Sequence, residues 1–228
     1  MKRILLAAIP ELSIGIFLIF SSNIGQTFFI SLFSGEIRNE FSLSHGMFGI
    51  FYSAATLLSA IVFFWLGKLT DQFNLTFLGL VTLGALSGFA FLLSSAETIL
   101  ILFLSLLGLR LFGQSMLSHI AITAMARWFS KKRGRALSIA LLGHPIGEAL
   151  LPSLIIYFLL QYTWRNIWLG IGIIIIIIIL PLVYWLGGYL KSRQFYRPNN
   201  SSLESKKILN VSWNRSQVLK DLRFYQII

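Results

Sequence analysis

The stretch "SLLGLRLFGQSMLSH", residues 105–119, decides the fold, because it places one arginine, Arg110, inside an otherwise apolar segment. The apolar segment continues on both sides and covers residues 98–126. A helix needs about 20 mostly apolar residues to cross the hydrocarbon core of a bilayer, which is about 30 Å thick. We therefore expect residues 98–126 to cross a membrane as a helix.

Five further segments have the same character. The chain has 228 residues, of which 56% are hydrophobic and 12% charged, and the apolar residues occur in long blocks. Such blocks form helices in a bilayer, because every backbone amide must be bonded within its own segment. The sequence predicts an all-α polytopic membrane protein with six transmembrane helices, at 12–34, 47–66, 75–94, 98–126, 136–160 and 166–190.

The six predicted helices divide into two triplets, 12–94 and 98–190, that cross the membrane in opposite senses. This order predicts two inverted three-helix repeats. Within them, pairs of glycines four residues apart allow helix backbones to approach closely, at Gly84 and Gly88 and again at Gly143 and Gly147. The predicted domains are a six-helix bundle over 1–190, a basic cytoplasmic linker over 191–222, and the truncated start of a seventh helix over 223–228.

The net charge of +11 is unevenly distributed along the chain. The connection "RWFSKKRGRA", residues 127–136, is strongly basic, whereas the connections expected on the other side contain only Arg38 and Arg165. Lysine and arginine accumulate in cytoplasmic loops, so we predict a multi-pass protein of a bacterial-type inner membrane with a cytoplasmic N-terminus. The basic loop then faces anionic lipid headgroups, and no nucleic-acid partner is predicted.

Motifs of enzymes and of cofactor binding are weak in this sequence. The chain has no cysteine and no Gly-rich phosphate loop, so we expect no cofactor, no metal site and no ATP-driven chemistry. His144 and Glu148, four residues apart, form the one pair that could hold a metal or act as an acid and a base. No third ligand or nucleophile accompanies them, and the prediction is that the protein is not an enzyme.

Two opposite charges are expected near the middle of the membrane. Arg110 and Glu148 each lie roughly 18 Å inside their helices, counted at about 1.5 Å per residue. A charge at this depth costs at least about 2.5–3.5 kcal/mol and is expected to have a partner. We predict that Arg110 pairs with Glu148, either as a working site or as a pair that only fixes the register of two helices.

Uncharged polar residues accompany this predicted pair. Gln114 lies one turn from Arg110, and His144 one turn from Glu148. Asn23 and Gln26 share a face of the first helix at a similar depth. His119 lies nearer the cytoplasm, about half a turn around the helix from Arg110, and is set apart from these residues. A milder polar stripe in the second helix completes the set, as Tyr52, Thr56 and Ser59. These side chains line a substrate or proton path, or form ordinary hydrogen bonds between helices.

Several motifs resemble those of the major facilitator superfamily of transporters. "GKLTDQF" is similar to the loop signature between the second and third helices through Gly67 and Asp71, which the resemblance implies are gating residues; Gln72 stands where a basic residue is usual. "GLRLFGQ" is similar to the fourth-helix signature at Arg110, an arginine associated with proton coupling or substrate charge. "RGRALSIALLGHPIGEALLP" resembles the fifth-helix pattern, but has Glu148 where that pattern has proline.

The resemblance extends to one branch of the superfamily. "GEIRNEFSLSHGMFGIFYSAATL" and "MARWFSKKRGRALSIA" look most like the monocarboxylate and oxalate/formate carriers. This implies secondary transport of a small organic anion by alternating access, with a carboxylate bound by Arg110 and a coupling proton on Glu148. The alternative is a six-helix scaffold or a transporter fragment without transport activity.

Transporters of this superfamily have two six-helix halves, and the chain resembles the N-terminal one. The tail from Lys191 resembles the linker between halves, and "VLKDLRFYQII" resembles the approach to a seventh helix. We expect either a truncated product that lacks the C-terminal half or a half-transporter that pairs with a second copy. Truncation is favoured, because the sequence stops inside a recognisable element.

Overall fold

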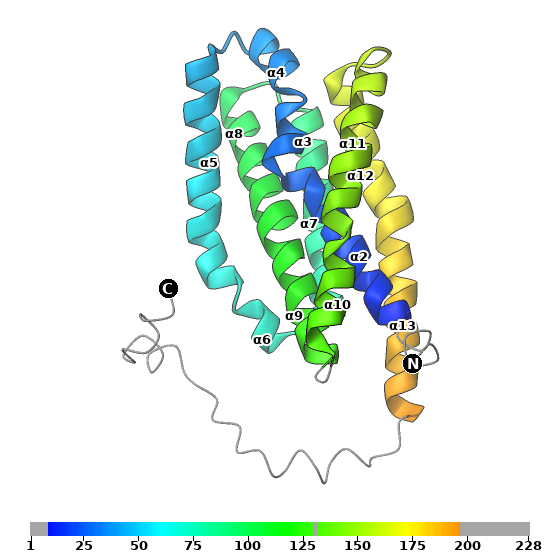
Figure 1. The fold of residues 1–228 in the computed structure, drawn as a ribbon. Helices are drawn as coiled ribbons and strands as arrows, with labels where there is room; N and C mark the ends of the chain where they lie inside the picture. Colours follow the sequence, from blue (N-terminus) through cyan, green and yellow to red (C-terminus); the bar gives the residue numbers. More distant parts are fainter. Residues whose placement is uncertain (1–8, 130–131, 197–228) are drawn as a thin grey trace. The chain divides into compact units, whose positions relative to one another are not determined.

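A computed structural model describes residues 9–129 and 132–196, and these residues form helices joined by short turns (Figure 1). The chain divides into two compact units, Met1–Lys191 and Ser192–Ile228. All of the predicted spans lie within the first unit. The structure describes the second unit only to the end of the last helix, so the rest of the predicted linker, and the predicted seventh helix, lie outside the described residues.

The described helices group into six spans and two short connecting helices. Span one consists of α2 (Ile9–Ser22), the 3-10 helix η1 (Asn23–Gly25) and α3 (Thr27–Ser31); it is followed by α4 (Ser34–Glu40), span two as α5 (His45–Leu66), α6 (Leu69–Gln72) and span three as α7 (Leu75–Ser94). Span four consists of α8 (Ile99–Gly108), the π-helix η2 (Leu109–Leu117) and α9 (Ser118–Trp128); span five of α10 (Arg133–Leu141) and α11 (Gly143–Leu159); span six of α12 (Trp164–Ile174), the π-helix η3 (Ile175–Ile179) and α13 (Leu180–Tyr196).

Spans two to six confirm the predicted fold class. By length and hydropathy, five segments are able to cross a membrane, at His45–Gln72, Leu75–Ser94, Ile99–Trp128, Arg133–Leu159 and Trp164–Gly188. Side-chain caps fix where several of these begin, because Ser44, Asn74, Thr98 and Thr163 each accept a hydrogen bond from a backbone N–H of the first turn. Span one is different, since its apolar helix covers only Ile9–Gly25.

Span one is broken where the sequence predicts a continuous helix over 12–34, and that prediction is wrong. Gln26 has an extended backbone (φ −78°, ψ 154°), and the helix restarts at Thr27. The break lies at a point of backbone contact with span four. A Cβ built on Gly25 would lie 2.2 Å from the Leu109 carbonyl oxygen, and one on Gly113 would lie 2.7 Å from the Gly25 Cα. The two helices therefore cross with only glycine hydrogens between their backbones.

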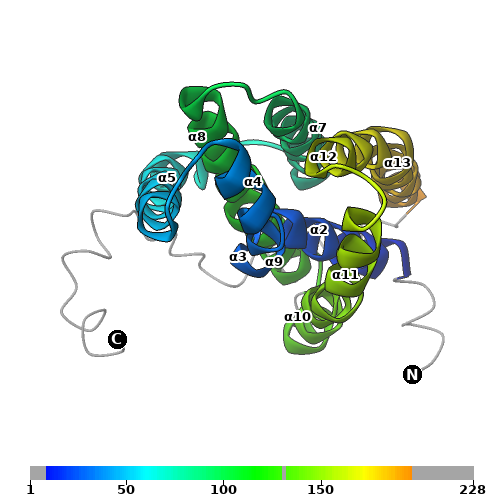
Figure 2. The same ribbon diagram turned by 90° about the horizontal axis from the view of Figure 1, so that it is seen from above.

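The six spans run up and down in the order expected of two inverted triplets (Figure 1). Span one lies in the interior of the unit, where α2 packs against α9 and η2 of span four and against α10 and α11 of span five. Span two packs on span four, and span six on span three. Seen from above, α5 and α12 lie on opposite sides of the unit (Figure 2). Spans one and four are thus the central elements.

The two glycine pairs behave differently. Gly143 lies against the backbone of α2, because a Cβ there would be 2.7 Å from the Ile16 carbonyl oxygen, and a Cβ on Gly147 would overlap the Asn23 side-chain amide. This confirms close packing of spans one and five. The same prediction is wrong for Gly84 and Gly88, whose Cβ positions would meet nothing within 4 Å in the described unit.

Candidate functional site

Arg110 lies at the centre of the unit, on the π-helix η2. Its guanidinium Nη1 donates to the Gly25 carbonyl oxygen and to the Thr27 hydroxyl, both at 3.1 Å. The side chain is only 6% exposed, and its Nε atom is buried without a hydrogen-bond partner. The break in span one places both acceptors here, since Gly25 and Thr27 flank the extended residue Gln26. π-helical segments occur frequently at functional sites.

Tyr52 of span two completes this centre. Its hydroxyl donates to the Thr27 hydroxyl oxygen at 3.0 Å, and its ring lies 5.3 Å from the Arg110 guanidinium carbon. A cation facing an aromatic ring at this distance is attracted by the ring quadrupole. Three spans therefore meet around one guanidinium. We call Gly25, Thr27, Tyr52 and Arg110 the arginine centre.

The predicted ion pair between Arg110 and Glu148 is not formed, although both residues are described. The reason is the position of span one. The π-helix η2, which carries Arg110, packs against α2, η1 and α5. The helix α11, which carries Glu148, also packs against α2 and η1 of span one. The depth of two residues in the membrane does not determine whether their helices are neighbours or have a third helix between them. Glu148 is exposed on the surface of the unit.

Asn23 forms a second polar cluster, between spans one and five. It is fully buried, and its Nδ2 donates to the carbonyl oxygens of Phe20 and Gly143, each at 3.0 Å. Its Oδ1 lies 3.1 Å from Nδ1 of the half-buried His144. Gly147 makes room for the amide, since any side chain there would overlap it. Three of the predicted path residues thus lie in two clusters, Arg110 in one and Asn23 with His144 in the other.

The remaining predicted path residues lie near these clusters without joining them by hydrogen bonds. Gln114 is half-buried on η2, and its Oε1 is buried without a partner. Gln26 is half-buried, and its extended backbone forms the break in span one. Thr56 and Ser59, from the predicted stripe in span two, donate to carbonyls of their own helix. Their contribution here is therefore local.

The loop between spans two and three is held to span four. Gly67 ends α5, and Asp71 lies on α6, where its carboxylate forms an ion pair of 2.5 Å with Arg127. Arg127 also donates to the Thr70 carbonyl oxygen at 2.6 Å. Both charged side chains are well exposed, so the ion pair contributes at most about 1 kcal/mol. His119 reaches the same loop, with Nε2 3.3 Å from the Thr70 hydroxyl.

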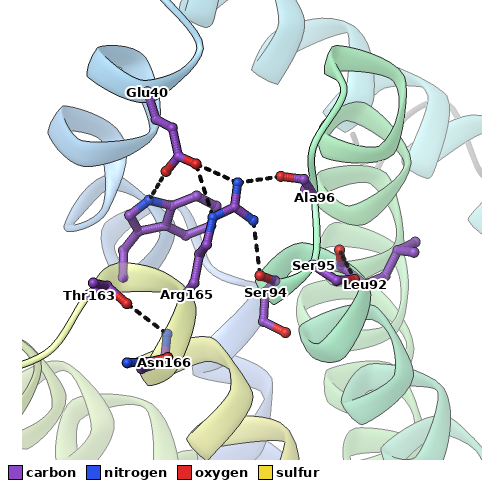
Figure 3. A network of polar contacts seen from close by, with 9 residues as sticks. Glu40, Leu92, Ser94, Ser95, Ala96, Thr163, Arg165 and Asn166 are labelled. Carbon is purple, nitrogen blue, oxygen red and sulfur yellow. Dashed lines mark hydrogen bonds and ion pairs between the residues drawn. The ribbon is translucent and has the colours of Figure 1, made fainter.

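The opposite end of the unit has a polar network that the sequence did not reveal (Figure 3). Arg165, at the start of α12, donates to the Glu40 carboxylate at 2.6 Å and to the carbonyl oxygens of Ser94 and Ala96 at 3.0 and 2.5 Å. Trp164 donates its indole N–H to the same carboxylate at 2.7 Å. Hydrogen bonds from Arg165 are the main cause that lowers the pKa of Glu40. One guanidinium therefore joins all three connections at this end.

This network, which we call the Arg165 clasp, lies far along the sequence from the arginine centre but is linked to it by packing. Trp168 follows Arg165 by one turn and is fully buried against Phe29 and Phe33, with ring centroids 5.7 and 5.1 Å away. Phe29 lies on α3, two residues after Thr27. The aromatic contacts thus hold the short helix α3 that presents Thr27 to Arg110.

The sequence reasoning missed Thr27 and the clasp for different reasons. Thr27 is a common residue in an apolar helix, and its role depends on a backbone break. A usable signal was the pair Gly25 and Gly113, at similar predicted depth on two spans. For the clasp, Arg165 was a rare basic residue on its side of the protein, and Trp164 beside it could have indicated a buried partner.

Metal binding has no support in the part of the chain that the structure describes. No group of three or more His, Cys, Asp or Glu side chains is placed there to hold an ion. His144 and Glu148 are neighbours on one helix, but a histidine and an exposed carboxylate provide only two ligands. The chemistry available in the two clusters is recognition of charge and hydrogen-bonding groups, and transfer of protons.

An apolar helix bundle with an interior cation beside a broken span has the features of a membrane transport protein, in which irregular backbone at membrane depth lines a solute path. The comparison with protein families agrees. The model of the Major Facilitator Superfamily matches residues 15–226, and the chain belongs to this superfamily of membrane transporters. It is accordingly a multi-pass membrane protein. No curated protein and no solved structure matched the chain.

Proposed function

We propose that this chain forms one half of a secondary transporter that moves a small organic anion, such as a monocarboxylate, by alternating access in symport with a proton. Membership of the superfamily supports transport of a solute. The anion and the proton are inferred from the charged side chains of the two central clusters. The bound carboxylate would take the place of the counter-ion that Arg110 lacks.

The observation that carries the proposal is the set of partners around Arg110. Its guanidinium is buried, yet its contacts in the described residues are a carbonyl, a hydroxyl and an aromatic ring, all of them neutral. A buried charge without an opposite charge is costly, so such an arrangement is retained where a ligand supplies the missing charge. The Nε–H without a partner offers a donor to a carboxylate oxygen, and charge-assisted bonds of this kind are the strong ones.

The other predicted path residues receive roles from their positions. Gln114, one turn along span four, would accept from or donate to the polar part of the substrate. Asn23 and Gln26 would shape the path at the break in span one. Glu148 and His144 would exchange the coupling proton. Gly67 and Asp71 would form the gating loop, with Asp71 held by Arg127 in the state seen here.

A second six-helix unit would complete the path, either a C-terminal half or a second copy of this chain. Span two supports this part of the proposal, because few of its residues are buried within the unit and most of its apolar side chains face outward. The basic end, with Lys68, Arg127 and the start of α10, would face the cytoplasm of a bacterial-type inner membrane, and the N-terminus with it. Anionic lipid headgroups would neighbour this end.

Uptake into proteoliposomes tests the proposal. The purified full chain would be reconstituted, and entry of radiolabelled formate, oxalate and lactate measured with and without an inward proton gradient. We expect at least one carboxylate to accumulate faster with the gradient than without it, and faster than into empty liposomes. Uptake equal to that of empty liposomes for every anion contradicts the proposal and favours the scaffold or inactive-fragment alternative.

A further inference from the structure

His144 and Asn23 make a contact whose chemistry fixes which ring nitrogen carries a hydrogen. The Asn23 Nδ2 atom lies 3.0 Å from two carbonyl oxygens, those of Phe20 and Gly143. Carbonyl oxygens only accept hydrogen bonds, so the atom facing them must be the amide nitrogen. The atom of Asn23 that faces His144 is therefore the oxygen Oδ1, and the usual ambiguity in amide orientation is removed by the partners themselves.

The consequence concerns the imidazole. An amide oxygen can only accept, and it lies 3.1 Å from Nδ1 of His144. Nδ1 must therefore carry a hydrogen in both the neutral and the charged ring. In the neutral ring, Nε2 then has a free lone pair. The ring can gain and lose a proton at Nε2 while the hydrogen bond to Asn23 is kept.

His119 provides the opposite case in the same chain. The single hydrogen of the Thr70 hydroxyl is donated to the Gly67 carbonyl oxygen at 2.8 Å. The same hydroxyl lies 3.3 Å from Nε2 of His119, so here it acts as the acceptor. His119 must then carry its hydrogen on Nε2. The two histidines are predicted to be opposite tautomers.

The surroundings of His144 are compatible with reversible protonation of its ring. The side chain is half-buried, and Glu148 follows it by one turn on the exposed side of α11. On the elements packed against α11, the other charged groups lie at the ends of helices, far from His144 along their elements: Glu11 on α2, Arg133 and Arg135 on α10, and Arg165 on α12. Arg110 belongs to η2, which is separated from α11 by span one. Among these charged groups, Glu148 is thus the one that lies within a single helical turn of His144.

We propose that His144 is the proton-binding group of this unit, taking up a proton from water at Nε2 while Nδ1–H stays bonded to Asn23, with the Glu148 carboxylate stabilising the charged ring. The use of this proton in symport rests on the proposed transport function. The predicted tautomer of His144 and its protonation at Nε2 are independent of the transport function. The proposal shifts the role of proton carrier from the carboxylate to the imidazole.

Nitrogen NMR of the full chain in lipid nanodiscs tests the tautomers directly. With only three histidines in the sequence, ¹⁵N-histidine labelling gives three sets of ring signals, which H45Q, H119Q and H144Q assign. At neutral or higher pH we expect His144 to be protonated on Nδ1 and His119 on Nε2. A His144 ring with its hydrogen on Nε2 overturns the proposal, as does a ring that binds no proton down to about pH 4.5, two units below the ordinary value.

The role of Glu148 and the link to transport are tested separately. E148Q should move the half-protonation of His144 to lower pH by a few tenths of a unit, as for other charge pairs one turn apart, while the matched change E11Q should leave it in place. If the pH of half-protonation of His144 is unchanged in E148Q, the Glu148 carboxylate does not stabilise the charged ring, and that part of the proposal is wrong. In the uptake assay, H144Q should lose the acceleration by a proton gradient, and H45Q, which changes an exposed histidine at the start of α5, should keep it. If wild-type protein moves no anion at all, the proposed function fails while the NMR result still stands on its own.

Discussion

At the scale of single residues, Arg110 and Arg165 differ in how the positive charge of the guanidinium is compensated. Arg165 is paired with the Glu40 carboxylate and two carbonyl groups, so its charge is compensated within the protein. Arg110 is more deeply buried and has neutral partners only among the described residues. The paired Arg165 stabilises the fold by joining three connections between helices. We propose that the spare donor of Arg110 binds an anionic substrate.

The Arg165 clasp makes a prediction about pH. Because the pKa of Glu40 is lowered in the folded protein, its contribution to stability is complete above the ordinary value of 4.5 and is lost as the pH falls through the lowered value. E40Q should therefore lower the free energy of unfolding in detergent by about 1 kcal/mol at pH 7, the upper end for partly exposed pairs. The difference from wild type should shrink progressively below pH 4.5.

Thermal unfolding of both proteins between pH 3 and pH 7 measures this difference. E36Q provides the matched control, because Glu36 lies on the same short helix and is exposed. It should unfold as wild type does at every pH. A gap between E40Q and wild type that is as wide at pH 3 as at pH 7 would show that the carboxylate charge is not what the clasp uses.

At the scale of elements, the sequence predicted the long spans well and the irregular ones poorly. Spans two and three begin and end within about two residues of their predicted bounds, because length and hydropathy fix a membrane helix. The break at Gln26 and the π-helix η2 were not predictable from periodicity, since both arise where two backbones touch at Gly25 and Gly113. Contact between distant segments decides such features. The arginine centre lies at this crossing.

The crossing of spans one and four should be intolerant of any side chain. A Cβ on Gly113 would lie 2.7 Å from the Gly25 Cα, which is backbone and cannot turn away. We expect G113A to destabilise the protein by about 1–3 kcal/mol, the usual cost of overfilling a packed interior. It should also weaken carboxylate uptake, because Arg110 lies on the same π-helix.

G88A is the matched control for this change. Its new methyl group would meet nothing within 4 Å, and alanine is the better helix former by about 1 kcal/mol. G88A should therefore unfold at the wild-type temperature or slightly above it. If G113A and G88A unfold at the same temperature, the two spans do not cross as closely as described.

At the scale of the whole molecule, the sequence supported the class of protein more firmly than the details of its site. The apolar blocks and the motifs around Asp71 and Arg110 indicated the superfamily that the family comparison then showed. Arg110 and Asn23 are buried within the bundle, whereas Glu148 is exposed on its surface. The predicted pairing of Arg110 with Glu148 was wrong, because depth along a helix does not say which face meets which neighbour. Orientation in the membrane stays a prediction from loop charge.

This orientation can be tested because the chain has no cysteine of its own. Lys132 is exposed at the basic end, and Gln161 is exposed in the turn before α12 at the opposite end. With the basic end in the cytoplasm, a membrane-impermeant maleimide should label Q161C on intact cells and label K132C only after permeabilisation. The reverse pattern would place the N-terminus outside.

The central claim, that Arg110 is kept in the interior to recognise a carboxylate, is tested most directly by uptake of lactate and of its uncharged amide by wild type, R110K and R110Q. Wild type should move lactate and discriminate against the amide. R110Q should lose at least about tenfold in lactate uptake, since hydrogen bonds to a charged partner are worth about 1.5–3 kcal/mol. R110K should fall between them, because it keeps the charge without the fork of donors. Lactate uptake by R110Q at the wild-type rate, or equal uptake of lactate and its amide by wild type, would contradict the account.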